Sequence, residues 1–183
     1  ERASCSSLCQ AKQPTATALK TIADLGYRFV DLSCLNWAPH VSVPGLIDDF
    51  EREARRVEAL LATHGLRVSN LTFDAVETRP FERYEPEFAA VVKLATRLEA
   101  RLINLMAPSL KADRADQVGK LRRLQSIAAR AGILLTLETH VGQITERPAA
   151  PEHQRHDEAD HDRRQPHAGV DQRHDDEPPA ELP

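Results

Sequence analysis

The sequence predicts an α/β protein: a partial (β/α)8 barrel of about five βα units over residues 1–146, followed by a disordered tail over 147–183. Short apolar or β-branched segments alternate with amphipathic helical segments about every 25–40 residues, which is typical of parallel strands joined by right-handed crossovers. Several strands also carry polar residues on one face. A barrel accepts such residues on its inner face near a catalytic mouth, whereas an open sheet covered on both sides prefers apolar strands.

Period-two alternation and β-branched content predict five strands, at residues 3–9, 28–35, 67–73, 101–107 and 133–139. Apolar residues at helical spacing predict four helices, at residues 15–25, 43–64, 86–98 and 113–131. Gly26, Gly65 and Gly132 follow three of these helices and favour their ends, because glycine adopts the left-handed conformation that closes a helix. Pro86 is expected to begin the third helix, since proline suits the first helical position.

The last predicted strand is the most informative stretch, because its apolar run Ile-Leu-Leu-Thr-Leu ends in Glu138 and then reaches His140. Side chains two residues apart on a strand share a face, so these two groups point the same way, opposite a wholly apolar face. A carboxylate in such a setting is costly unless a cation or a metal pairs with it. We interpret Glu138 and His140 as catalytic-site residues at the barrel mouth. A salt bridge from Glu138 to a barrel-lining Arg or Lys is the structural alternative for the carboxylate, and a position on the following loop is the alternative for His140.

Further polar and aromatic residues fall at the same predicted mouth. Trp37 and His40 follow the second strand, where an aromatic ring and an imidazole suit packing and hydrogen bonding to a sugar ring. Asn70, Asn104 and Asp31 stand on neighbouring strands, where they are suited to bind a polyol or a metal-bound water. The alternatives are that Trp37 covers the barrel end and that the three polar residues satisfy one another at the rim.

Charge and composition divide the chain in two. Residues 1–146 hold 19 Lys and Arg against 18 Asp and Glu, a net charge of +1, together with every aromatic residue. Residues 147–183 hold 5 Arg against 10 Asp and Glu, a net charge of −5, with five of the eight His and six of the twelve Pro. So polar a segment cannot bury enough apolar surface to offset its ordering entropy. Both a native disordered tail and a frameshift or truncation near residues 147–150 would give this composition.

Several function classes are disfavoured. Residues 1–146 accumulate no excess of either charge, which argues against nucleic acid or a membrane as partner. No apolar run approaches the ~20 residues of a membrane-spanning helix, no signal-peptide pattern opens the chain, and neither GxGxxG nor GxxxxGK[ST] occurs. Cys5, Cys9 and Cys34 are odd in number and strand-like in setting, which argues against a disulfide framework. We therefore expect a cytoplasmic protein.

Residues 3–146 resemble the xylose isomerase-like TIM-barrel superfamily, the sugar phosphate isomerase/epimerase group. The resemblance rests on Ser-Cys-Ser-Ser-Leu-Cys at 4–9, Leu-Gly-Tyr-Arg-Phe-Val-Asp-Leu at 25–32, Gly-Leu-Arg-Val-Ser-Asn at 65–70 and, above all, Leu-Thr-Leu-Glu-Thr-His at 135–140. It implies a divalent metal (Mn, Mg or Zn) in the full-length parent, with Glu138 as a metal ligand and His140 as a neighbouring substrate contact. The family's other ligands come from later strands, where this chain has only its tail, and one carboxylate is too few to hold the metal.

The resemblance implies a fragment of a divalent-metal-dependent sugar or sugar phosphate isomerase or epimerase, which transfers a proton at the carbon next to a carbonyl. The small-molecule partner would be a sugar or polyol bound by Trp37, His40, Asn70 and Asn104. A non-catalytic truncated remnant or binding module is one alternative. An AP endonuclease-like metal hydrolase is another, disfavoured by the lack of a basic surface. The unpaired strand edges of an incomplete barrel also predict self-association, and we expect the chain itself to lack isomerase activity.

Overall fold

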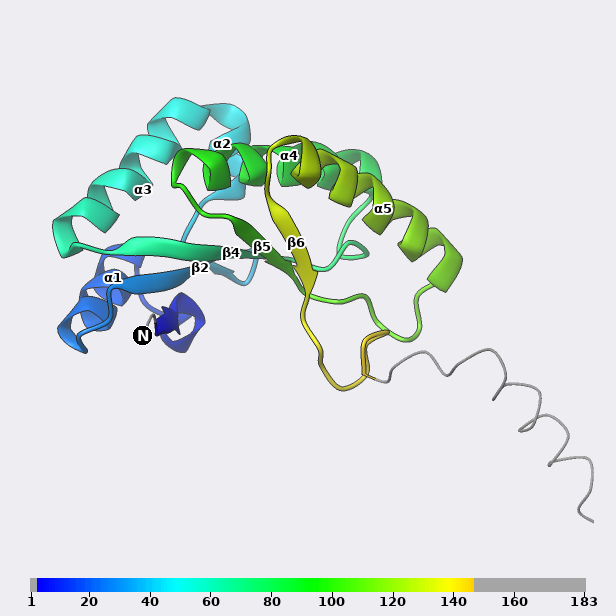
Figure 1. Cartoon of the computed structure of the whole chain (residues 1–183), viewed down its shortest axis with the longest axis horizontal. Coiled ribbons are helices and arrows are strands. Elements are labelled where there is room, and N and C mark those ends of the chain that lie inside the picture. The colour runs from blue at the N-terminus through cyan, green and yellow to red at the C-terminus, as the bar shows by residue number, and fades with distance from the viewer. Residues whose placement is uncertain (1–2, 147–183) are drawn as a thin grey trace, which may run out of the picture. The chain divides into compact units, whose positions relative to one another are not determined.

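The computed structural model describes residues 3–146 of the chain (Figure 1). The predicted tail, 147–183, lies outside these residues. The elements are, in chain order, β1 (Ser4–Ser6), the 3₁₀ helix η1 (Ser7–Gln10), α1 (Thr15–Asp24), β2 (Phe29–Leu35), β3 (Ala38–Pro39), α2 (Val43–Asp48), α3 (Phe50–His64), β4 (Arg67–Phe73), α4 (Phe81–Arg97), β5 (Leu102–Leu105), α5 (Arg114–Arg130) and β6 (Leu134–Leu137).

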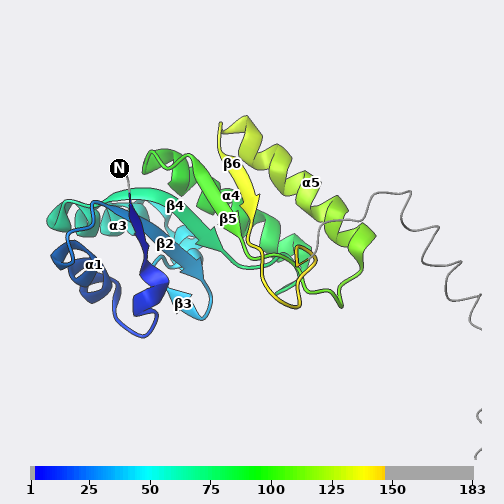
Figure 2. The same ribbon diagram turned by 60° about the horizontal axis from the view of Figure 1, so that its bottom comes forward.

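One parallel sheet organises this body. Its strands follow the order β1-β2-β4-β5-β6, and the short β3 pairs antiparallel with the end of β2. Figure 2 shows β1 at one side of the sheet and β6 at the other. Consecutive parallel strands are joined by helical connections, as βα units require. The predicted alternation and the partial barrel-like α/β fold are therefore confirmed.

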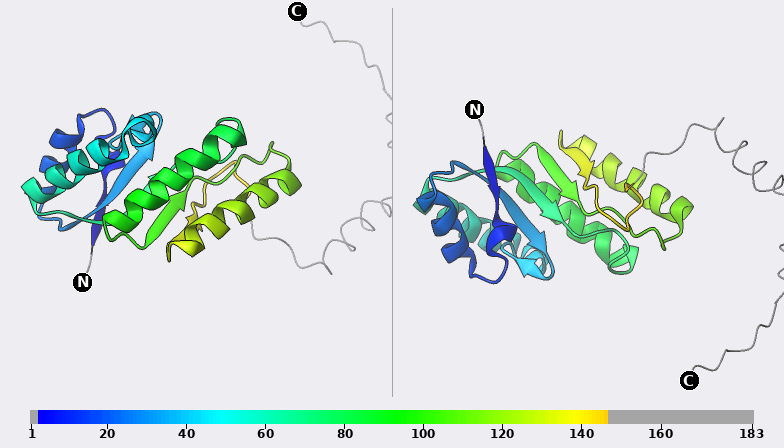
Figure 3. Two further views of the ribbon diagram at one scale, coloured as in Figure 1. Left: turned by 90° about the horizontal axis from the view of Figure 1, so that it is seen from above. Right: turned by 90° about the horizontal axis from the view of Figure 1, so that it is seen from below.

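The helices cover one face of the sheet. Figure 3 shows α4 and α5 in front of the strands from above, whereas from below the strands come into view. The core lies between these layers, where Val30, Leu71 and Ile103 meet Leu61 and Phe88, all of them buried. Leu135 and Leu137 pack against this core and Thr136 does not belong to it, as the alternation in the last strand predicts. Among residues 3–146 no helix is both long and apolar enough to cross a bilayer.

A β-bulge in β4 changes which residues reach the core. Val30 pairs with Val68 and Asp31 with Asn70, so Ser69 is an extra residue with no partner in β2. The Ser69 hydroxyl donates to the Val30 carbonyl at 3.0 Å, which holds the bulge. Val68 and Leu71 therefore both face the helices although they are three residues apart, and Asn70 joins Asp31 on the other face.

Three predicted boundaries are wrong. The first strand ends at Ser6 rather than residue 9, because the Ser6 hydroxyl accepts from the Leu8 amide and caps η1. The predicted helix 43–64 is interrupted at Asp49, whose extended backbone separates α2 from α3 and whose carboxylate accepts from the Arg52 amide at 3.1 Å. The third helix begins at Phe81 instead of Pro86. Proline removes only one hydrogen bond there, and the buried Tyr84 keeps the first turn packed.

We expect the chain to self-associate, because β1 and β6 each have a partner on only one side within residues 3–146. Leu134 on β6 is 61% exposed and adds an apolar contact to an open strand edge. Light scattering at micromolar concentration should show species larger than a monomer. Leu134→Lys should reduce their amount, because a charge on an edge strand opposes pairing.

Ile47→Lys is the matched control, since Ile47 is 50% exposed but lies on α2, away from either sheet edge. It should leave the association unchanged. A monodisperse wild-type monomer that melts in one cooperative transition would contradict this prediction.

Candidate functional site

Polar side chains line the face of the sheet opposite the apolar core. This polar face consists of Asp31 on β2, Asn70 and Thr72 on β4, Asn104 on β5, Thr136 on β6 and Glu138 just beyond β6. The strand register aligns them, because Asp31 pairs with Asn70, and Thr72, Asn104 and Thr136 pair in one row. Three of the predicted site residues, Asn70, Asn104 and Glu138, therefore belong to one surface.

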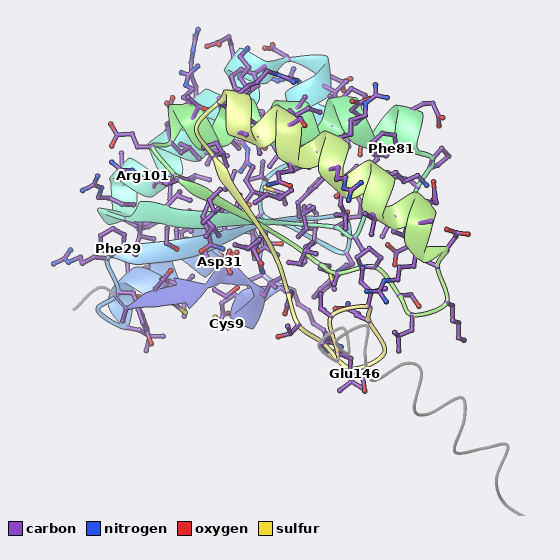
Figure 4. All side chains as sticks on the ribbon, turned by 45° about the vertical axis from the view of Figure 1, so that its right-hand side comes forward. Cys9, Phe29, Asp31, Phe81, Arg101 and Glu146 are labelled. Carbon is purple, nitrogen blue, oxygen red and sulfur yellow. The ribbon has the colours of Figure 1, made fainter. Side chains whose placement is uncertain are left out.

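Asp31 is the carboxylate of the polar face that lies within a strand, on β2. Figure 4 shows it between the end of the sheet marked by Phe29 and Arg101 and the loop that carries Glu146. Its Oδ1 accepts a hydrogen bond from the Thr72 hydroxyl at 2.7 Å. Burial raises the pKa of Asp31 above its ordinary value, and the negative charge of Glu138 adds to the increase, while hydrogen bonds from Thr72, Ser6 and Asn70 oppose it.

Glu138 is fixed by its backbone rather than by its side chain. Its amide donates to the Leu105 carbonyl at 2.8 Å, which continues the pairing of β5 and β6, and its carbonyl accepts from the Thr145 hydroxyl at 2.8 Å. The half-buried carboxylate forms no hydrogen bond or ion pair with any residue of 3–146. The salt-bridge alternative thus has no Arg or Lys partner in the described chain, and Glu138 offers free ligand oxygens on the face that also carries Asp31.

The loop after β6 holds Glu138 in place through contacts with the loop after β5. Ser109 forms an isolated antiparallel bridge with Gln143. The Ile144 amide donates to the Pro108 carbonyl at 2.9 Å, and the Leu110 amide donates to the Gly142 carbonyl at the same distance. Both loops follow the carboxyl ends of neighbouring strands, which is where barrel enzymes place their active sites.

Asn104 has a partner within the polar face. Its Oδ1 accepts from the Thr136 hydroxyl at 2.9 Å, and its amide NH₂ forms no hydrogen bond within residues 3–146. The side-chain oxygen of Asn70 likewise lies 2.9 Å from the Ser69 hydroxyl. The polar groups of this face therefore satisfy one another in part, as the alternative interpretation expects. The NH₂ group of Asn104 remains available as a donor to a ligand.

The remaining predicted site residues lie elsewhere. Trp37 is 62% exposed in the turn between β2 and β3, and His140 is exposed, with Nδ1 3.0 Å from the Val141 carbonyl. His40 is buried, its Nε2 lies 3.3 Å from the Gln13 carbonyl, and burial lowers its pKa. It lines a cavity of about 750 Å³ between α3 and the segment before α1, away from the polar face. The structure does not bring Trp37, His40 and His140 together with Asn70 and Asn104.

The sequence analysis did not predict a buried ionic network that lies beside the site. Arg79 forms ion pairs with Asp74 at 3.0 Å and with Glu87, and all three side chains are less than a tenth exposed. The Asn36 amide donates to Asp74 at 3.2 Å, which ties the turn that carries Trp37 to the loop after β4. A carboxylate directly after the buried end of β4 is the same signal that singled out Glu138, and it would have indicated Asp74.

Two carboxylates are not enough for a divalent metal. Asp31 and Glu138 share the polar face, yet within residues 3–146 no group of three or more His, Cys, Asp or Glu side chains is placed to hold an ion. Mg²⁺ and Mn²⁺ require an octahedral set of oxygen ligands, and a catalytic Zn²⁺ requires three protein ligands. The described residues alone therefore do not form a metal centre.

The parallel strand order, the helix layer on one face and the polar residues on the other define this body as a partial, barrel-like α/β fold. No family model and no curated protein sequence matches the chain, but solved structures do. One is the probable 3-DHS dehydratase AsbF from Bacillus anthracis, with a TM-score of 0.59, 16% identity, and 79% of this chain aligned to 54% of that one.

Two further structures have the same fold. The xylose isomerase domain protein from Alicyclobacillus acidocaldarius has a TM-score of 0.53 and 20% identity, covering 80% of this chain and 54% of its own. The IolI protein, solved with a bound zinc atom, has a TM-score of 0.55 and 13% identity, covering 78% and 54%. Likeness at this identity shows the fold alone. The described body is built like part of a xylose isomerase-like TIM barrel, and the chain spans about half the length of these structures.

The raised pKa of Asp31 predicts a pH-dependent effect of Asp31→Asn. The unfolded chain ionises Asp31 at lower pH than the folded protein does, so its contribution to stability is present below the ordinary Asp pKa and is lost as pH rises through the folded pKa. Asparagine keeps the oxygen that accepts from Thr72 and avoids this loss. The variant should melt at a higher temperature than wild type at pH 7, with the difference shrinking toward pH 3.

Asp24→Asn is the control, since Asp24 is exposed and only pairs with Lys20 along α1. Its melting temperature should stay close to wild type across the same pH range. An Asp31→Asn variant that is less stable than wild type at pH 7 would show that the carboxylate is stabilised in the fold.

Proposed function

We propose that this chain is part of a divalent-metal-dependent sugar or sugar phosphate isomerase or epimerase. The observation that carries the proposal is the polar face, on which Asp31 pairs with Asn70 within β2 and β4, and Asn104 lies one row nearer the carboxyl edge of the sheet. Glu138 lies at that carboxyl edge, just after β6, and its carboxylate has no hydrogen-bond or ion-pair partner in residues 3–146. The xylose isomerase-like fold supports the proposal, because barrels of this kind use that edge for chemistry.

The residues of the polar face suit a polyhydroxylated substrate. Asn70 and Asn104 place side-chain amides on this face; Thr72 holds Asp31, Thr136 holds Asn104, and the Ser69 hydroxyl holds the side-chain oxygen of Asn70. Asp31, with its raised pKa, retains a proton at higher pH than an ordinary aspartate. That property fits a group that gives and takes a proton at the carbon next to a carbonyl.

Glu138 is the residue we propose as a metal ligand in the complete barrel. A divalent metal would polarise a substrate carbonyl, but residues 3–146 supply too few ligands, so the others must come from outside them. Trp37 and His140 are exposed on the loops that follow β2 and β6 and do not join Asn70 and Asn104 in the described body; we propose that they border the substrate from those loops. Burial of His40 leaves it the weakest of the proposed substrate contacts.

The test measures how fast deuterium from the solvent enters a sugar. The protein is incubated in D₂O with Mn²⁺ and each member of a panel of aldoses and ketoses, and NMR monitors the exchange. A barrel completed by further βα units should exchange the hydrogen next to the carbonyl, and Glu138→Gln and Asp31→Asn should each slow that exchange at least about tenfold, the lower range of general acid–base and metal effects. Absence of exchange in the completed barrel with every sugar would overturn the proposal.

A non-catalytic binding module is the second candidate. It is favoured by the lack of a three-ligand metal group within 3–146. A binding module would show line broadening of sugar or polyol signals with this chain in the absence of any metal, together with no deuterium exchange. Substitution of Asn104 by alanine should then weaken binding, because its free amide donors are lost.

A further inference from the structure

Two cysteines near the start of the chain form a close pair. Cys5 lies on β1 and Cys9 on η1, and their Sγ atoms are 3.7 Å apart. Cys9 is exposed and Cys5 is half-buried, whereas the third cysteine, Cys34, is fully buried in the core. Figure 4 labels Cys9 on the side of the sheet away from α4 and α5.

The pair arises from the early end of the first strand. Had the strand continued to residue 9, four residues of extended chain would hold the two thiols about 13 Å apart. Instead the Ser6 cap turns the chain into a 3₁₀ helix, which brings Cys9 back over Cys5. A disulfide bond is about 2.05 Å long, so the two sulfurs, now 3.7 Å apart, must approach by less than about 2 Å to form one.

We propose that Cys5 and Cys9 form a modification site, at which a peroxide oxidises the two thiols to an intrachain disulfide. The Cys9 thiolate attacks one peroxide oxygen, the O–O bond breaks, and Cys9 becomes a sulfenic acid as hydroxide leaves. The Cys5 sulfur then attacks the Cys9 sulfur, the S–O bond breaks, and a second hydroxide leaves. The two thiol protons convert both hydroxides to water, and two electrons pass from sulfur to the peroxide.

The surroundings assign different roles to the two sulfurs. Burial and the hydrogen bond with Cys9 raise the pKa of Cys5, and the charge of Asp31 adds to this, so Cys5 stays protonated until it resolves the sulfenic acid. Cys9 is the sulfur that solvent reaches, and therefore the one that meets the oxidant first.

The disulfide would act on the polar face through Ser6. Ser6 lies between the two cysteines in sequence, and its hydroxyl hydrogen-bonds to Asp31. Closing the five-residue ring would fix the backbone on which that hydroxyl is carried. Oxidation is therefore expected to alter the hydrogen bond between Ser6 and the Asp31 carboxylate of the polar face, whatever ligand that face binds.

The experiment uses the whole chain, treated with equimolar hydrogen peroxide, alkylated with iodoacetamide under denaturing conditions and analysed by intact mass and peptide mapping. The wild type should lose two hydrogens, carry one carbamidomethyl group on Cys34, and give a peptide that joins Cys5 to Cys9. Dithiothreitol should restore three alkylation sites. Cys5→Ser should instead accumulate sulfenic acid on Cys9, trapped by dimedone, and Cys34→Ser should form the disulfide as wild type does.

Three results would overturn the proposal. The first is full alkylation of Cys5 and Cys9 after peroxide, and the second is a disulfide to Cys34. The third is cross-linking between chains alone, seen as a dimer on a non-reducing gel with no intrachain link. Cys9→Ser controls for peroxide damage elsewhere, because it leaves every other side chain in place and should show no loss of hydrogen.

Discussion

Glu138→Ala is expected to abolish Mn²⁺ binding in a barrel that contains this chain and its missing βα units, while the fold remains intact. The substitution removes an anionic ligand whose carboxylate forms no hydrogen bond or ion pair with any residue of 3–146, so no polar partner is left unpaired by its loss. Metal affinity in such sites depends on the number of charged oxygen ligands, and the loss of one should lower it by orders of magnitude. Calorimetric titration of wild type and variant measures the difference directly.

Glu99→Ala is the matched control for this substitution. Glu99 lies just before β5, at the amino end of the sheet, where it is exposed and pairs only with the exposed Arg67. Its removal should leave Mn²⁺ affinity unchanged. Equal affinity in Glu138→Ala and wild type would reject Glu138 as a ligand and return it to a structural role at the end of β6.

Regular patterns carried the prediction of the fold. Apolar residues at helical and at period-two spacing placed every major helix and every parallel strand, because burying one face of each element is what the tertiary structure requires. Left-handed Gly65 and Gly132 end α3 and α5 at the predicted points. The prediction from periodicity failed at Asp49, where one side chain decides the backbone conformation. The Asp49 carboxylate caps α3, so one continuous amphipathic pattern forms two helices.

The candidate site was only partly accessible to the same reasoning. Glu138, Asn70 and Asn104 were predicted because each is polar within or directly after an apolar strand, and the structure places them on one face of the sheet. The bulge at Ser69, however, depends on a hydrogen bond to Val30 that lies 39 residues away in sequence, and no local pattern reports it. The position of His40 could not be predicted for the same reason, since its partner is the carbonyl of Gln13, on a segment distant in sequence.

Arg79→Met is expected to destabilise the fold by about 3–5 kcal/mol, the cost of breaking a buried ion pair by removing one partner. The Arg79 guanidinium lies 5.2 Å from the ring centre of Phe73 and 5.0 Å from that of Tyr84, and is 7% exposed between Asp74 and Glu87. Methionine preserves the apolar stem against both rings but leaves two carboxylates buried without a cation. Urea denaturation at pH 7 and low protein concentration measures the loss of stability.

Arg83→Met separates this effect from the simple loss of a charge. Arg83 contacts the same Glu87, at 2.9 Å, but its side chain is 69% exposed, so its removal should cost less than about 1 kcal/mol. Adding Asp74→Asn and Glu87→Gln to Arg79→Met should recover most of the lost stability, because no uncompensated charge then remains buried. Equal costs for the two arginine variants would show that the network is solvated in the folded protein. A large difference would establish that the loop after β4, and through Asp74 the turn that bears Trp37, is held by buried charge at the edge of the candidate site.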